Sequence, residues 1–241
     1  MPQALAYFDG DYVPLSDANV NITTHALHYG TAVFEGIRGN WNEEKGKFFV
    51  FRAREHYQRF LQGCNIMLMD IPHSVDDLMD ITSELIIRCG YKQDLYIRPI
   101  AYKSEELVAN LKLHELASSF ALIVVPFGAY IEGESAIRCC TSSWRRIDDT
   151  MIPPRVKISG HYVNSILAKT EAVLAGFDEA IFMNQDGSIS EGSGENLFLV
   201  ADGILHTPLV SDNNLTGITR DSAWTLAENE LGLQVIERRI R

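Results

Sequence analysis

Lys157 and Glu191 are the two residues of this chain whose side chains together indicate a specific chemistry. A lysine ε-amine can form a Schiff base with an aldehyde, and a carboxylate can keep a pyridine nitrogen protonated. Pyridoxal phosphate makes both of these demands on a protein. Most lysines are solvated surface groups and most Glu-Gly pairs form turns, so neither residue is decisive alone. The hypothesis of a pyridoxal-phosphate site therefore depends on the surrounding residues.

A phosphate-binding segment is indicated by the turn Leu215-Thr216-Gly217-Ile218-Thr219, which leads directly into an amphipathic helix. Backbone amides and the positive end of a helix dipole meet at such a start, and both suit an anion. An ordinary helix cap by Thr219 is the alternative. Arg59, on the first long helix that we expect, could supply a fixed positive charge. Taken singly, Arg59 is more simply interpreted as a surface arginine.

A wall for a ligand is indicated by residues 24–38, where aromatic side chains are mixed with Gly30 and Gly36. Glycine lets a backbone pass close to a ligand while rings enclose it, and core packing is the alternative. Tyr96 and Arg98 alternate along an expected strand, so both project from one face. A phenol beside a guanidinium suits a carboxylate. A cross-strand pair exposed to solvent is the alternative for these two residues.

The composition argues against several classes of partner. The formal net charge is −11, whereas nucleic acids and anionic membranes require a basic face. The chain has no run of eighteen apolar residues and no secretory leader, so we expect a cytoplasmic protein that does not associate with membranes. The four cysteines have no zinc spacing and are expected to be free thiols. The seven histidines show no metal-ligand spacing, so we expect no metal site.

The hydrophobic pattern predicts a mixed α+β chain in two parts. The expected elements are a hairpin at 5–15, helices at 54–69 and 74–89, strands at 95–102, 120–125 and 137–141, a helix at 163–175, hairpins turning at 186–187 and 202–203, a helix at 220–231, and a strand from Leu233. Ser74 with Asp77 matches a capping box, and Gly90 matches a helix terminator. The break near Pro126 predicts a small α+β domain over 1–126, an interdomain loop over 127–134, and a large cofactor-binding domain over 135–241.

Four motifs together resemble the class IV pyridoxal-phosphate aminotransferases. They are residues 28–38, Lys157 with Gly160 and Tyr162, residues 190–198, and residues 217–221. The resemblance extends over nearly the whole chain in the family's order and is closest to the branched-chain amino acid aminotransferases. It implies the family's two-domain α+β fold. It also implies transamination between a branched-chain L-amino acid and 2-oxoglutarate by a ping-pong cycle on pyridoxal phosphate.

The resemblance implies a role for each cofactor-binding residue. Lys157 would be the Schiff-base lysine and the proton carrier, and Glu191 would pair with the pyridinium nitrogen. Tyr162 would hydrogen-bond the phenolic oxygen of the cofactor. The phosphate would be held by Arg59 and by the turn that contains Leu215, Gly217, Ile218 and Thr219.

The same resemblance implies how substrates are selected. Tyr96 would help to bind the α-carboxylate, and Arg98 would bind the distal carboxylate of glutamate. The walls of the apolar pocket would be formed by Tyr29, Phe34, Tyr130 and Tyr162, with Gly36 leaving room and Arg38 behind it. The partners would be small amino acids, 2-oxo acids and a second copy of the chain, in a homodimer or a multiple of one.

Three alternatives stand beside this interpretation. A D-amino acid transaminase or an aminodeoxychorismate lyase would keep the fold and cofactor but change the reaction, and a non-catalytic relative would keep the fold alone. The chain also stops at 236–241, where relatives continue through a Thr/Gly/Ala loop that helps to hold phosphate and substrate. We therefore expect that the C-terminal part of the second domain is missing and that the sequence is a fragment of a longer protein.

Overall fold

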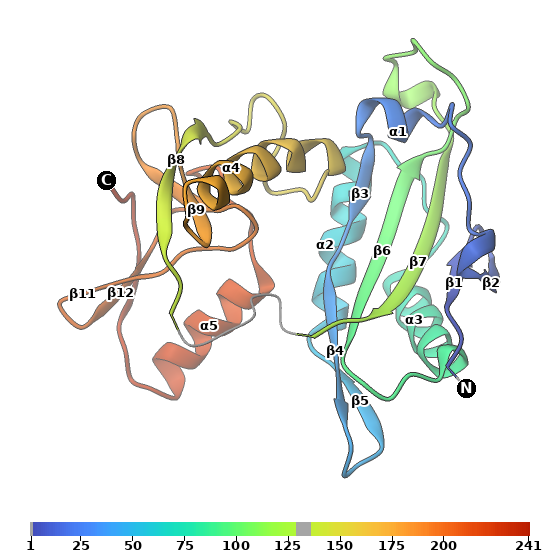
Figure 1. Ribbon diagram of the computed structural model, residues 1–241, viewed down its shortest axis with the longest axis horizontal. Helices are drawn as coiled ribbons and strands as arrows, with labels where there is room; N and C mark the ends of the chain where they lie inside the picture. The colour runs from blue at the N-terminus through green and yellow to red at the C-terminus, as the bar shows by residue number, and fades with distance from the viewer. Residues whose placement is uncertain (1, 129–135) are drawn as a thin grey trace. The chain divides into compact units, whose positions relative to one another are not determined.

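The computed structural model describes residues 2–128 and 136–241. The chain divides into two compact units, which are drawn in Figure 1 and described separately below. Unit 1 consists of Met1–Glu132 with Lys157–Gly160, and unit 2 of Gly133–Val156 with His161–Arg241. The segment Lys157–Gly160 thus belongs to unit 1, whereas it was expected in the second domain. Backbone contacts with the first unit explain the difference, as shown below for Lys157.

Unit 1 contains a seven-stranded sheet with the strand order β2-β1-β7-β6-β4-β5, in which β3 also pairs with β6. Its strands are β1 (Leu5–Phe8), β2 (Asp11–Pro14), β3 (Ala32–Phe34), β4 (Ile37–Asn42), β5 (Lys47–Val50), β6 (Leu95–Lys103) and β7 (Ser118–Pro126). Its helices are α1 (His25–Tyr29), α2 (Ala53–Ile66) and α3 (Val75–Cys89), with short 3-10 turns η1 (Leu15–Asp17) and η2 (Leu113–Glu115). The strand pairs of this sheet are antiparallel.

Helices α2 and α3 cover one face of this sheet (Figure 1). On the central strand β6, Leu95 and Ile97 are fully buried, while the intervening Tyr96 and Arg98 are half-buried. Because successive side chains on a strand point to opposite faces, Tyr96 and Arg98 lie on the face away from the buried pair. The core therefore occupies one face of the unit 1 sheet and leaves the other for polar groups.

The helix cap, the helix terminator and the hairpin turn predicted for unit 1 are confirmed. Helix α3 begins at a capping box between Ser74 and Asp77 and ends at Gly90, whose φ of 65° is left-handed. The turn of the first hairpin has φ values of 47° at Asp9 and 105° at Gly10. Positive φ at both central residues matches the twist of a two-residue hairpin.

Unit 2 contains two three-stranded sheets, with the orders β10-β9-β8 and β11-β12-β13. The strands are β8 (Cys139–Arg145), β9 (Glu179–Met183), β10 (Ile189–Gly192), β11 (Leu199–Ala201), β12 (Ile204–Thr207) and β13 (Val235–Glu237). The helices are α4 (Tyr162–Leu174) and α5 (Ile218–Asn229). The 3-10 turn η3 (Ser159–His161) precedes α4, and its first two residues belong to unit 1. Helix α4 packs on β8 and β9 through a core of Ala168, Ala172, Ala180 and Phe182.

Strand β8 covers Cys139–Arg145 rather than 137–141, and the predicted starts of two further elements in unit 2 were wrong. Helix α5 begins at Ile218 rather than at residue 220, because the carbonyl of Gly217 already accepts the N–H of Asp221 at 3.0 Å. The last strand begins at Val235 rather than at Leu233, because the N–H of Leu233 closes the end of α5 by donating to the carbonyl of Ala227 at 2.9 Å. Both differences come from backbone hydrogen bonds that extend the influence of a helix beyond its hydrophobic pattern.

Within residues 2–128 and 136–241, no helix is both long enough and apolar enough to cross a bilayer. The same residues contain no group of three or more His, Cys, Asp or Glu side chains that could hold a metal ion.

Candidate active site

Lys157 lies on a short extended segment that pairs with β3 in unit 1. The N–H of Phe34 donates to the carbonyl of Lys157 at 3.0 Å. Farther along the same segment, the N–H of Gly160 donates to the carbonyl of Gly30 at 3.0 Å. A side chain on Gly30 would place its Cβ 2.5 Å from the Cα of Gly160, and Gly30 has a left-handed φ of 67°. Two glycines thus allow the close backbone approach that positions Lys157.

The ε-amine of Lys157 lies near an aromatic ring and a buried acid. Its Nζ is 5.4 Å from the centroid of the Phe34 ring. Glu35, which follows Phe34, has a side chain that is only 1% exposed. The positive charge of Lys157 is one of the causes that lower the pKa of Glu35. The amine is therefore held beside β3 in a partly apolar environment that also contains one carboxylate.

Arg59 and His56, both on α2, bind Glu35. Arg59 donates from Nε to Oε1 at 2.6 Å and from Nη2 to Oε2 at 2.8 Å, and the Nδ1 of His56 lies 2.9 Å from Oε2. Burial alone would raise the pKa of Glu35, but the hydrogen bonds from His56 and Arg59 and the charge of Arg59 outweigh it and lower the pKa to about 2. Glu35 is therefore ionised, and Arg59 is held in a fixed orientation.

The expected substrate-binding residues of β3, β4 and β6 share one face of the unit 1 sheet. Arg38 pairs with Tyr96 across β4 and β6, and side chains at paired positions lie on the same face. Arg98 donates from Nη2 to the hydroxyl of Tyr96 at 2.7 Å, and its guanidinium carbon lies 4.2 Å from the centroid of the Phe34 ring. A Cβ on Gly36 would lie 2.8 Å from Cζ of Tyr96, so only glycine leaves room for this phenol.

The Nε of Arg98 is buried and has no hydrogen-bond partner among residues 2–128 and 136–241. A buried guanidinium nitrogen without a partner is costly, because it has left water without a replacement. The guanidinium of Arg98 lies over the aromatic rings of Phe34 and Tyr96, so its Nε–H points into a largely apolar environment. Such a donor is suited to an anionic group of a ligand.

Arg38 and Tyr29, which are also expected in the substrate pocket, each have contacts within unit 1. Arg38 donates from Nη1 to the carbonyl of Gly128 at 2.8 Å and stacks on Phe127 with 5.1 Å to the ring centroid. Tyr29 is on α1, where its hydroxyl accepts the N–H of Ala109 at 2.9 Å and its side chain contacts His25. Tyr130 lies outside the described residues.

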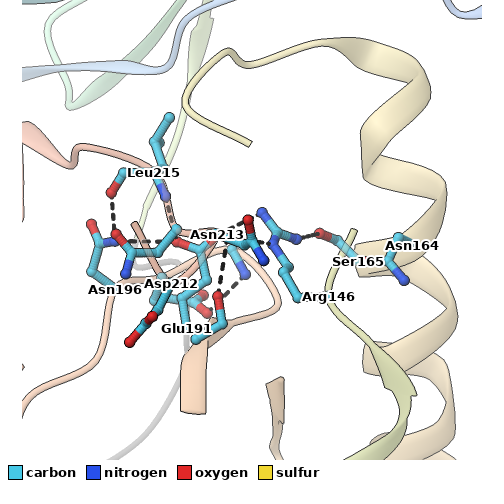
Figure 2. A network of polar contacts seen from close by, with 12 residues as sticks. Arg146, Asn164, Ser165, Glu191, Asn196, Asp212, Asn213 and Leu215 are labelled. Atoms are coloured by element: carbon cyan, nitrogen blue, oxygen red, sulfur yellow. Dashed lines mark hydrogen bonds and ion pairs between the residues drawn. The ribbon is translucent and has the colours of Figure 1, made fainter. Parts of the chain in front are cut away.

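In unit 2, Glu191 on β10 is buried at the centre of a polar network (Figure 2). Oε2 accepts the side-chain N–H of Asn196 at 3.1 Å and the backbone N–H of Leu215 at 3.0 Å. Oε1 accepts a hydrogen bond from Nη2 of Arg146 in a buried ion pair. In each of these three contacts the partner donates to the carboxylate, an arrangement that favours its ionised form.

The start of α5 lies next to this network. Asn196 also donates to the carbonyl of Leu215 at 2.8 Å, so it ties the turn before α5 to Glu191. Gly217 is the N-cap and no side chain caps the helix there, so the alternative of a cap by Thr219 was wrong. A Cβ on Gly217 would overlap Oδ1 of Asn196. The first turn, with Ile218 and Thr219, therefore presents the positive end of a helix dipole close to a compact, glycine-dependent turn.

Sequence reasoning missed Glu35 and His56 in unit 1, and Arg146 in unit 2. The Glu35 contact with Arg59 had a partial signal, because both residues lie in segments that were singled out separately. No sequence signal pointed to Arg146, because a lone arginine after a strand is usually solvated. Asn196 lies inside the motif of residues 190–198, but its role in orienting Glu191 was not foreseen.

The chain is similar to class IV aminotransferases over almost its whole length. The family model "Amino-transferase class IV" matches residues 32–241. A probable branched-chain-amino-acid aminotransferase of Aquifex aeolicus is 44% identical over 235 residues, which make up 98% of this chain and 75% of that protein.

Solved structures agree. The branched-chain aminotransferase of Thermoproteus uzoniensis with norvaline has a TM-score of 0.93 at 40% identity, covering 99% of this chain and 78% of that one. The "T.th." branched-chain amino acid aminotransferase complexed with N-(5'-phosphopyridoxyl)-L-glutamate has a TM-score of 0.91 at 38% identity, covering 99% and 77%. The chain therefore belongs to the class IV aminotransferases, which are pyridoxal-phosphate-dependent enzymes with this mixed α+β fold. It spans 75–78% of the length of these relatives.

The residues that the structure describes fit pyridoxal phosphate. Glu191 is a buried acid that accepts hydrogen bonds from three donors, which suits a protonated pyridine nitrogen, and Lys157 supplies an amine for an aldehyde. The turn at Gly217 has no room for a Cβ and opens a helix without a side-chain cap, which leaves backbone amides for an anion such as phosphate. The described residues thus include the amine, the acid and the helix start that the aldehyde, the ring nitrogen and the phosphate of this cofactor call for.

Proposed function

We propose that this chain transfers the amino group between a branched-chain L-amino acid and 2-oxoglutarate. The observation that carries the choice of substrates is the Arg98 guanidinium. It has a buried donor without a partner in the part of the chain that the structure describes, beside the rings of Phe34 and Tyr96. Rings favour an apolar side chain, and a recessed guanidinium favours the distal carboxylate of glutamate. The norvaline and glutamate groups named for the solved relatives are of these two kinds.

Each part of the cofactor has a proposed ligand. Glu191 holds the pyridine nitrogen in its protonated form, Tyr162 hydrogen-bonds the phenolic oxygen, and Arg59 binds the phosphate. The turn of Leu215 and Gly217 and the first amides of α5, at Ile218 and Thr219, add donors for the phosphate. When bound, pyridoxal phosphate supplies an aldehyde that receives the amino group and a ring that takes up electrons from Cα.

Lys157 is proposed as the catalytic residue. Its ε-amine would hold the cofactor through the aldehyde, and as a free amine it would carry the proton that leaves Cα of the substrate. In the first half of the cycle a branched-chain amino acid leaves as its 2-oxo acid, and in the second half 2-oxoglutarate leaves as glutamate. Tyr96 binds the α-carboxylate, which both substrates share.

The side-chain pocket is proposed to accept leucine, isoleucine and valine. One methylene in an apolar pocket changes binding by only about 1–3 kcal/mol, so strong discrimination among the three is not expected. Phe34, Tyr29, Tyr130 and Tyr162 form the walls in this proposal. Gly36 leaves room for the Tyr96 ring, and Arg38 lies behind the pocket.

We also propose that the chain works as a homodimer, or a multiple of one, in the cytoplasm. Support for self-association comes from α4, which exposes Val163, Ile166, Leu167, Val173 and Leu174. Support for a reducing compartment comes from the cysteines, which are free thiols: Cys64, Cys89, Cys139 and Cys140. Sedimentation at several concentrations tests the assembly, and a purely monomeric chain would contradict it.

The experiment that tests the function is reduction of the pyridoxal-phosphate complex with borohydride, followed by peptide mapping. The label is expected on Lys157, and Lys157→Ala is expected to lose both the label and turnover while remaining folded. Lys112→Ala is the matched control, because Lys112 pairs with Glu115 at the surface. Comparison of L-leucine, D-alanine and aminodeoxychorismate tests specificity. A preference for either of the last two would overturn the branched-chain assignment.

A further inference from the structure

The ion pair between Arg146 and Glu191 is buried, with both side chains only 6% exposed. Removing two charges from water is expensive, and well-packed apolar residues are often at least as stabilising in such positions. Stability alone is therefore a weak explanation for the pair. The position of this ion pair in the network around Glu191 suggests a functional explanation (Figure 2).

Arg146 is fixed by several different parts of unit 2. It follows β8 directly, and its N–H donates to the carbonyl of Met183 on β9 at 3.0 Å. Nε donates to the carbonyl of Asn213 at 3.3 Å, Nη1 donates to the hydroxyl of Ser165 on α4 at 3.3 Å, and Nη2 binds Glu191. Asn213 has a left-handed φ of 62°, which asparagine tolerates better than most residues. A planar guanidinium can reach these three acceptors at once, whereas an ammonium has no such fork.

The contacts described on Glu191 divide between its two oxygens. Arg146 reaches Oε1, while Asn196 and the N–H of Leu215 reach Oε2. Each of these contacts donates a hydrogen to the carboxylate. A neutral carboxyl would have to turn its own O–H toward one of these donors, so the arrangement disfavours protonation of Glu191.

We propose that Arg146 is the positioning residue that keeps Glu191 ionised and oriented, so that a proton shared with a pyridine nitrogen resides on the nitrogen. This inference rests on the proposed function, in which Glu191 faces that nitrogen. In a site of low dielectric, a neutral acid beside a neutral pyridine competes with the charged pair. A cation in direct contact with the carboxylate stabilises its negative charge. The same cation repels the positive charge of a protonated pyridine nitrogen less strongly, because that nitrogen is farther away. Arg146 thus favours the charged pair.

The test uses the 241-residue chain and four variants: Arg146→Met, Arg146→Lys, Glu191→Gln and the double variant Arg146→Met/Glu191→Gln. Arg145→Met is the matched control, because Arg145 is the neighbouring arginine and is exposed. Equilibrium affinity for pyridoxal phosphate is measured by absorbance titration. Thermal unfolding without cofactor is measured from about pH 5 to about pH 8, the range in which most proteins are most stable. The second measurement needs no activity and no bound cofactor.

If Arg146 acts through Glu191, Arg146→Met weakens cofactor binding by about tenfold or more, since a shift of one pKa unit changes the ratio of ionised to neutral carboxyl tenfold. Once Glu191 is glutamine, the same substitution costs no more than about twofold further, because residues that act as a unit are not additive. Arg146→Lys restores part of the affinity, and Arg145→Met binds like the wild type.

Without cofactor, Arg146→Met leaves a buried carboxylate uncompensated, which is strongly destabilising. The double variant is therefore expected to unfold at a higher temperature than Arg146→Met. That difference shrinks as the pH falls toward about 5, because burial without a cation favours the neutral form of the Glu191 carboxyl. If Arg146→Met does not fold, recovery of folding in the double variant supports the same coupling.

Two results overturn the inference: cofactor affinity of Arg146→Met within about twofold of the wild type, or a loss in the double variant equal to the product of the two single losses. Failure of the proposed function gives a different result. In that case the wild-type chain itself takes up no borohydride-fixed pyridoxal phosphate on Lys157, whereas the cofactor-free unfolding still reports whether Arg146 holds Glu191 ionised.

Discussion

Arg59 donates two parallel hydrogen bonds to Glu35, from Nε to Oε1 at 2.6 Å and from Nη2 to Oε2 at 2.8 Å. The Glu35 side chain is 1% exposed and that of Arg59 is 13% exposed, so the pair is almost completely removed from solvent. A bidentate fork fixes the plane of a guanidinium as well as its position. The proposed phosphate ligand of unit 1 is thus oriented by a carboxylate that sequence reasoning did not select.

Glu35→Gln is expected to destabilise the protein at neutral pH by on the order of 3 kcal/mol, from a pKa lowered from 4.5 to about 2 at about 1.4 kcal/mol per unit. A carboxyl whose folded pKa is below its unfolded pKa contributes stability above the unfolded value and loses it as the pH falls. The difference in unfolding free energy between wild type and variant should therefore shrink as the pH falls from 4.5 to about 2.

Urea unfolding at about pH 7, 4 and 3 measures this difference on both sides of the unfolded pKa. Glu84→Gln is the control, because Glu84 forms an exposed pair with Arg88 on α3 and should change stability by less than about 0.5 kcal/mol. A gap between wild type and Glu35→Gln that stays constant over the whole series would show that the charge of Glu35 is not what stabilises the fold.

Gly36→Ala is expected to lower kcat/KM by about tenfold or more, because the new Cβ would lie 2.8 Å from Cζ of Tyr96 and would displace a stiff ring. The displaced phenol would also lose its hydrogen bond from Arg98. Gly39→Ala on β4 is the control, since its Cβ would make ordinary contacts of 3.5–3.8 Å. Steady-state kinetics with leucine and 2-oxoglutarate measure both, and equal effects of the two substitutions would argue against a special role for Gly36.

Gly217→Ala is expected to weaken the binding of pyridoxal phosphate by about tenfold, because a Cβ would overlap Oδ1 of Asn196. Asn196 cannot move freely, since it is bonded to both Glu191 and Leu215. The titration is compared with Thr225→Ala, an exposed position farther along α5. Unchanged affinity in Gly217→Ala would mean that the turn yields without disturbing the site.

Lys103→Met is expected to destabilise unit 1 by about 2–3 kcal/mol. The buried ammonium of Lys103 donates to the carbonyls of Leu68 and Leu116 and to the hydroxyl of Ser118, at 2.7–3.1 Å. Methionine fills similar space but leaves these acceptors without a donor. Urea unfolding measures the loss, and Lys112→Met at the surface is the control. A change within about 0.5 kcal/mol would place Lys103 among neutral positions.

Local structure could be predicted because its causes are local. The capping box of Ser74 and Asp77, the terminator Gly90 and the hairpin turn at Asp9 and Gly10 each depend on residues a few positions apart. The start of α5 was misplaced because its first hydrogen bond runs to the carbonyl of Gly217, and a glycine carries no helical signal of its own.

The sequence by itself determined the family, the cofactor and the chemical types of the key residues, since an amine, an acid and a glycine-rich turn are properties of residue identity and spacing. Tertiary structure alone decided which partners control those groups. Glu35 and Arg59 are 24 positions apart in the sequence, and Arg146 and Glu191 are 45 positions apart, yet each pair is hydrogen-bonded. The physical reason is that folding brings such groups out of water together, and only there does the charge of one set the state of the other.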